Sequence, residues 1–175
     1  MNQPYQLAQI NIALPLAPLD TPQLAEFMAG LAPINALADA SPGFVWRLQS
    51  AEGDATTIRA FNDDRLLINM SVWVSLGTLS DFVYRSAHTA YLRRRRAWFA
   101  RLAESVTTLW WLPAGQLPTI ADAEQRLATL RQYGPTPVAF TVQQPFPPPA
   151  NDEDLALNPN AISPATRALP LSSGE

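Results

Sequence analysis

The chain has 175 residues, of which 47% are hydrophobic and 15% are charged, so it has enough apolar side chains to build one domain with a core. Its net charge of −3 argues against binding to nucleic acid, whose phosphates attract basic surfaces. The absence of cysteine excludes disulfides, thiolate metal sites and thiol catalysis, and the absence of lysine excludes a lysine Schiff base.

The N-terminal segment does not have the pattern of a signal peptide. It begins without basic residues and carries Gln and Asn within its apolar run. No apolar stretch approaches the roughly 20 residues that a membrane-spanning helix needs. We therefore expect a cytoplasmic protein that makes no contact with a membrane.

The chain opens with a strand pattern followed by a helix pattern. Residues 6–14 alternate in hydrophobicity with a period of two, which predicts a β-strand. A helix is expected over residues 22–40, with Asp20 or Thr21 as its N-terminal cap. Proline cannot continue the helical hydrogen-bond ladder, so we expect Pro33 to interrupt this helix.

The middle of the chain contains two further strand patterns and a long helical segment. Residues 44–49 and 66–74 predict strands, and residues 56–60 predict a short edge strand between them. The helical pattern that follows covers residues 75–102. We expect a break in this segment at Ser86.

The last part of the predicted domain reads strand, helix, strand. Residues 107–112 and 138–142 predict strands. Residues 119–133 predict a helix, because Thr119 can cap it and Asp122 stands three residues later, which is close to a capping box.

The composition changes after Phe146, where prolines accumulate and large apolar residues become rare. This composition predicts a single domain over residues 1–146 and a disordered, Pro-rich tail over residues 147–175. The element order predicts the α+β class, with a ferredoxin-like split βαβ antiparallel sheet and the helices on one face. We expect a second subunit to cover the other face and so form a homodimer, because an apolar sheet face cannot stay in water.

The alternation of the two expected central strands separates an aliphatic face from a mixed face. Ile68, Met70 and Val72 point to one side of the third strand. The mixed face combines amides, a hydroxyl and an indole, which together are typical of a ligand pocket; its members are Gln9, Asn11, Asn69, Ser71 and Trp73. The alternative is that these side chains bond to one another across the sheet and face solvent or a dimer interface.

His88 is the only histidine, and it lies on the same predicted helical face as Arg95. One hypothesis makes His88 a general base or a metal or haem ligand, with Arg95 holding an anionic group. The alternative is a hydrogen-bonded histidine in the core or at a helix cap, together with a salt-bridged arginine. A single histidine with scattered carboxylates gives no support for a metal site.

Several segments together resemble a bacterial family catalogued as domain of unknown function 3291. The resemblance covers Gln6 to Phe146, and it is carried by the segments QLAQINIA, PINALADASPGFVWRLQ, LLINMSVW, FVYRSAHTAYLRRRRAWF, LWWLPAG and GPTPVAFT. That family is similar in layout to the dimeric α/β-barrel superfamily, which includes antibiotic-biosynthesis-type monooxygenases and haem-degrading oxygenases. The resemblance implies a small-molecule ligand and a homodimer.

The resemblance also suggests roles for particular residues. Cofactor-free monooxygenases of the superfamily hold an aromatic or polyketide-like substrate among Asn, Trp, Arg and His, so His88, Asn69 and Arg95 are catalytic candidates. The candidates for ligand contact are Gln9, Asn11, Ser71, Trp73, Phe82 and Tyr84. In haem-degrading members the equivalents of Phe82 and Leu92 are Trp and His, so we expect no cofactor and keep haem as an alternative. A non-catalytic binding module is the remaining hypothesis.

Overall fold

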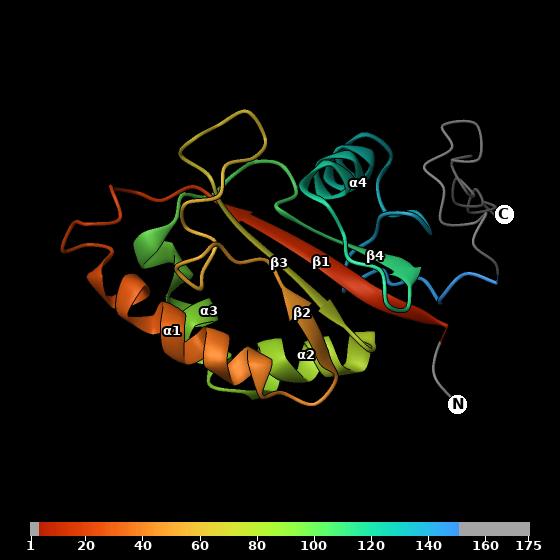
Figure 1. Ribbon diagram of the computed structural model, residues 1–175. Coiled ribbons are helices and arrows are strands. Elements are labelled where there is room, and N and C mark those ends of the chain that lie inside the picture. Colours follow the sequence, from red (N-terminus) through yellow and green to blue (C-terminus); the bar gives the residue numbers. More distant parts are fainter. Residues whose placement is uncertain (1–3, 151–175) are drawn as a thin grey trace, which may run out of the picture.

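The computed structural model describes residues 4–150, which form a mixed α+β fold around one antiparallel sheet (Figure 1). The strands are arranged in the order β2-β3-β1-β4, so the first and third strands are central neighbours, as the sequence predicts. Their bounds are β1 (Tyr5–Ala13), β2 (Phe44–Arg47), β3 (Leu67–Trp73) and β4 (Thr107–Pro113).

Helices cover both faces of the sheet, whereas the sequence predicts them on one face only. Helix α4 lies on one side of the sheet and the other three helices lie on the opposite side (Figure 1). Their bounds are α1 (Ala25–Asp39), α2 (Leu76–Arg85), α3 (His88–Trp98) and α4 (Ile120–Tyr133).

The aliphatic face of the sheet forms the main core. Ile10, Met70 and Val72 are buried there against Leu127 of α4, and apolar side chains from the loop over residues 48–66 pack beside them. This face is therefore covered within one chain. Because α1, α2 and α3 lie over the other face (Figure 1), the argument that a second subunit must cover one face of the sheet no longer holds, so a homodimer stays a prediction without that support.

Helix α1 is continuous through Pro33, so the predicted interruption is wrong. Pro33 and Ala29 are both exposed, so water can satisfy the Ala29 carbonyl that loses its helical donor. The helix also begins later than predicted. Residues 18–25 make successive tight turns instead, including a hydrogen bond from the Thr21 amide to the Pro18 carbonyl.

Two predicted strands do not form as such. Residues 56–60 belong to the irregular loop between β2 and β3. In place of a strand at residues 138–142, isolated bridges form, one of them between Phe140 and Leu109 of β4. Their backbone amides and carbonyls exchange two hydrogen bonds of 2.8 and 2.9 Å, so this segment protects the edge of β4.

The long helical segment is divided at Ser86, as predicted, into α2 and α3. However, α3 ends at Trp98 and not at Leu102. Phe99 is extended and forms a β-bridge with Pro15, because the chain after β1 offers backbone partners that a further helical turn would lose. Helix α4 begins with the predicted capping box of Thr119 and Asp122.

The described part of the chain contains no helix that is both long and apolar enough to cross a membrane. Phe146 still packs on the domain, since its ring lies 5.9 Å from that of Phe140 and its carbonyl accepts a hydrogen bond of 2.9 Å from the Trp111 indole. Most of the predicted tail, residues 151–175, lies outside the described residues.

Candidate functional site

A cavity of about 520 Å³ lies between the mixed face of the sheet and the helices α1, α2 and α3. The sheet supplies the polar side chains on its floor, while the helices supply mostly apolar side chains opposite. All residues that the sequence marks as site candidates line this one cavity: Gln9, Asn11, Asn69, Ser71, Trp73, Phe82, Tyr84, His88 and Arg95.

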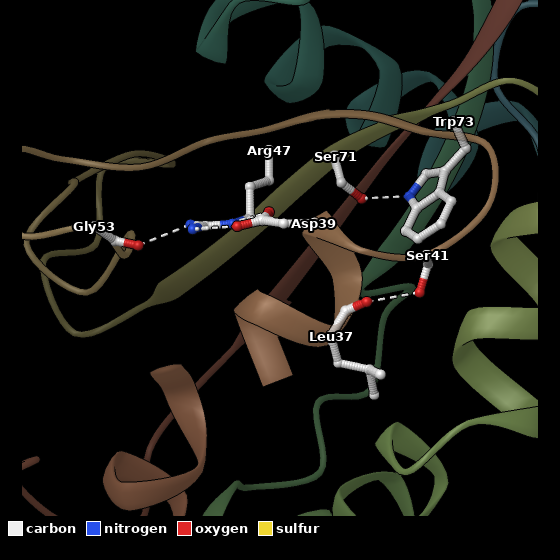
Figure 2. Close-up of polar contacts among 7 residues, drawn as sticks. All are labelled: Leu37, Asp39, Ser41, Arg47, Gly53, Ser71 and Trp73. Atoms are coloured by element: carbon white, nitrogen blue, oxygen red, sulfur yellow. Dashed lines mark hydrogen bonds and ion pairs between the residues drawn. The ribbon is translucent and has the colours of Figure 1, made fainter. Parts of the chain in front are cut away.

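The floor of the cavity carries a hydrogen-bonded group that joins β1 to β3. Gln9 Nε2, the nitrogen of the side-chain amide, donates to Asn69 Oδ1 at 2.7 Å and to Ser71 Oγ at 3.0 Å. The Trp73 indole also donates to Ser71 Oγ, at 2.9 Å (Figure 2). The register explains this group, because Gln9 lies directly opposite Ser71, and Asn69 is two residues from Ser71 on the same face of β3.

This group leaves polar atoms available to a ligand. Ser71 Oγ accepts from two donors, so its own proton needs an acceptor elsewhere. Among the residues that the structure describes, the Ser71 hydroxyl proton has no acceptor. Gln9 Oε1, the oxygen of the side-chain amide, has no donor among them either. The floor therefore offers one donor and one acceptor side by side, as a site that orients a ligand requires.

An aromatic series continues from the floor into the helices. Trp73 is 1% exposed; its ring meets Phe44 edge-on at 5.4 Å and stacks on Phe82 at 5.1 Å. Phe82 in turn lies 5.0 Å from the His88 imidazole. The rings therefore pack on one another, and Phe82 and His88, which are only partly buried, keep ring surface beside the cavity.

His88 begins α3 and is held by the turn that separates it from α2. Its backbone amide donates to Ser86 Oγ at 3.1 Å, and its Nδ1 lies 3.3 Å from the Val83 carbonyl. A carbonyl can only accept, so Nδ1 carries the proton and Nε2 keeps the lone pair. Burial lowers the pKa of His88 below its usual value, partly offset by the bond to Val83. The neutral imidazole can therefore act as a base.

The lowered pKa of His88 predicts that stability declines in mild acid. The unfolded chain binds a proton at a pH near 6.5, where the folded chain does not, so stability is fully present above that pH and is lost as the pH falls below it. We expect His88→Phe, which keeps a ring beside Phe82, to remove this part of the decline. Thermal denaturation of both proteins between pH 8 and 5.5 measures the difference.

The carboxylate of Asp63 does not contribute to this pH dependence. Hydrogen bonds from Arg65 hold the pKa of Asp63 at about 2, so its protonation falls well below the window used for His88. If the thermal stability of wild type and of His88→Phe fell equally as the pH was lowered, His88 would not be the cause of the loss.

The structure places three other site candidates outside the hydrogen-bonded group of the floor. Asn11 donates to Thr107 Oγ1 at 2.7 Å, so its amide nitrogen is engaged with β4. Tyr84 is 47% exposed. Arg95 is exposed and donates to the Leu92 carbonyl at 3.3 Å. It lies at the margin of the cavity, not within an apolar helix face.

The sequence interpretation missed the wall that α1 provides. Phe27, Leu31 and Ile34 line the cavity at helical spacing, a signal that the assumed break at Pro33 concealed. Gly30 lies between them, and a Cβ atom there would be 2.1 Å from Tyr91 Cε1. The Tyr91 ring of α3 therefore occupies the space that this glycine leaves.

Arg47 of β2 fixes the end of α1 beside the cavity. Its guanidinium donates to Asp39 at 2.8 Å and to the Gly53 carbonyl at 2.8 Å (Figure 2). The arginine is thus already neutralised within the chain. In residues 4–150 no group of three or more His, Asp or Glu side chains is placed to hold a metal ion.

Comparison with known proteins identifies the family and gives no activity. The family model described as "Domain of unknown function (DUF3291)" matches residues 6–156, and no curated protein matches the chain. The crystal structure of PA3566 from Pseudomonas aeruginosa is similar to 65% of this chain and 95% of its own, with 16% identity and a TM-score of 0.41. The crystal structure of NE2512, a protein of unknown function from Nitrosomonas europaea, is similar to 66% of this chain and 97% of its own, with 13% identity and a TM-score of 0.40.

Proposed function

Because the chain belongs to the DUF3291 family, which carries no known activity, we propose from the cavity itself that the protein binds a small aromatic or polyketide-like molecule. The observation that carries this proposal is the floor of the cavity. There a donor and an acceptor stand beside the aromatic rings of Phe82 and His88. Convergent polar groups in a mostly apolar hollow are the general signature of a small-molecule site.

The floor also suggests how such a ligand lies. A planar ring placed against Phe82, which is only partly buried, buries apolar surface of both rings. A carbonyl group of the ligand then accepts the Ser71 hydroxyl proton, or a hydroxyl group of the ligand donates to Gln9 Oε1 of the side-chain amide. His88 lies at the end of the aromatic series, next to the edge of that ring.

Binding can be tested with hydroxylated aromatic compounds such as naphthols, anthrones and hydroquinones, by thermal shift and then by calorimetry. We expect Ser71→Ala to weaken binding of the best compound by about tenfold, the effect of one lost hydrogen bond. Thr108→Val is the matched control, because it also deletes a buried hydroxyl but from the opposite face of the sheet. Equal effects of the two variants would contradict binding at this floor.

Catalysis by a cofactor-independent monooxygenase mechanism is the second candidate, and the neutral, cavity-lining His88 favours it. In this reaction His88 Nε2 takes the proton of a phenol, and the phenolate activates an adjacent CH2 group toward O2. The carbon loses two hydrogens and gains one oxygen atom as a carbonyl, and the second oxygen atom leaves as water. O2 is thus the oxidant and the substrate supplies the electrons, as a reaction without a bound cofactor requires.

An oxygen electrode tests this second candidate with any compound that binds. We expect oxygen uptake that His88→Gln abolishes while binding is retained. Binding without uptake would leave a binding module. A Soret shift on haem titration that His88→Gln removes would favour the haem alternative.

The same superfamily interpretation includes a homodimer of the α/β-barrel type. It is supported by the strand order, in which β1 and β3 are central and antiparallel. Sedimentation equilibrium measures the mass in solution, and a monomer at all concentrations would contradict the proposal.

A further inference from the structure

The margin of the cavity is positively charged, although the chain as a whole has a net charge of −3. Arg95 and Arg96 of α3 and Arg101 of the following loop all line it. Within residues 4–150, the only carboxylate in the lining is that of Asp54, which accepts bonds from the amide and the hydroxyl of Thr56. The charge is therefore concentrated at this place by the fold and not by the composition.

None of these three arginines forms a salt bridge within the part of the chain that the structure describes. Four arginines elsewhere on the surface do pair with carboxylates, whereas Arg59 and Arg93 do not pair with any among the described residues; the pairs are Arg65–Asp63, Arg85–Asp81, Arg94–Glu26 and Arg131–Glu104. Arg47, the other arginine of the lining, is paired with Asp39. Three arginines without a salt bridge thus lie together at the cavity.

Apolar and aromatic side chains line the cavity beside these charges. Tyr91 and Trp98 come from the same helix as Arg95, and Phe27 faces them from α1, with its ring 5.8 Å from that of Trp98. A ligand that satisfies both regions has a ring system for the hollow and a negative group for the margin. Guanidinium groups match carboxylates and similar oxyanions because they donate two parallel hydrogen bonds.

We propose that the ligand of this cavity is an amphipathic organic anion, whose aromatic body lies among the helices and whose anionic group is held by Arg95, Arg96 and Arg101. This inference rests on the proposed function, since it names the chemical class of the molecule that the same cavity binds. It adds that the negative group, and not only the aromatic body, determines which molecules bind.

Two fluorescent probes that differ only in charge separate these contributions. 8-Anilinonaphthalene-1-sulfonate carries a sulfonate, and N-phenyl-1-naphthylamine has the same rings without it. We expect the wild-type protein to bind the anionic probe more tightly, and added salt to weaken only that probe. The triple variant Arg95→Gln/Arg96→Gln/Arg101→Gln should weaken the anionic probe by about tenfold and leave the neutral probe unchanged.

Arg95→Gln is also made as a single variant, and Arg93→Gln is its matched control. Arg93 is exposed on the same helix but does not line the cavity, so its loss changes the net charge equally. If Arg93→Gln weakened the anionic probe as much as Arg95→Gln does, or if both probes bound equally in every variant, the anion inference would be wrong while cavity binding stood. If neither probe bound the folded wild-type protein, the proposed function would fail as well.

Discussion

Trp73→Ala should reduce the free energy of unfolding by about 3–5 kcal/mol, which is the usual cost of removing a fully buried aromatic side chain. Trp73 is 1% exposed and packs between Phe44 and Phe82, so its loss leaves a gap between β3 and two neighbouring elements. It also removes one of the two donors to Ser71. Urea denaturation followed by circular dichroism measures the change.

Trp73→Phe separates packing from hydrogen bonding at the same position. It keeps a ring between Phe44 and Phe82 but deletes the indole N–H, so we expect a cost of about 1–2 kcal/mol. Trp110→Phe is a suitable control, because Trp110 is equally buried on the opposite face and has no hydrogen bond from its indole among the described residues. A loss below about 1 kcal/mol for Trp73→Ala would contradict the packing described for it.

Gly43→Ala should reduce the free energy of unfolding by about 2–4 kcal/mol, the next largest loss after that of Trp73→Ala. Gly43 has a φ angle of +78°, which costs a residue with a side chain about 1–2 kcal/mol. In addition, a Cβ atom would lie 2.5 Å from Thr78 Cγ2, and Thr78 belongs with Ser75 to the capping box that begins α2. The contact therefore damages the helix end as well as the turn.

Gly53→Ala provides the comparison for this experiment. Gly53 also has a positive φ, of +90°, but no atom of the described residues lies within 4 Å of the place that a Cβ would take. Gly53→Ala should therefore reduce the free energy of unfolding only by the backbone cost of a positive φ angle, about 1–2 kcal/mol. Equal losses in the two variants, measured by urea denaturation, would show that the contact with Thr78 carries no cost.

The floor of the cavity could be predicted from the sequence because a strand allows only two directions for its side chains. The alternation placed Gln9, Ser71 and Trp73 on one face without any knowledge of the helices. The register between β1 and β3 then made them neighbours. Which atoms bond to which, however, depends on distances that no alternation pattern contains.

The helical walls could not be predicted to the same degree, because they depend on tertiary contacts. Pro33 breaks an isolated helix, yet α1 passes through it where the freed carbonyl is exposed to water. Leu102 continues the helical pattern of α3, yet the pairing of Phe99 with Pro15 ends that helix earlier. At Pro33 exposure to water, and at Phe99 the pairing with a distant residue, outweighs the local preference.

The contact between Gly30 and Tyr91 has a consequence for ligand size. The ring of Tyr91 lies over a position on α1 that has no side chain, and it occupies the place where a Cβ would stand. Any larger residue at position 30 would have to move this ring, and Tyr91 lines the cavity. A change at this one small residue would thus alter the dimensions of the molecules that the protein accommodates.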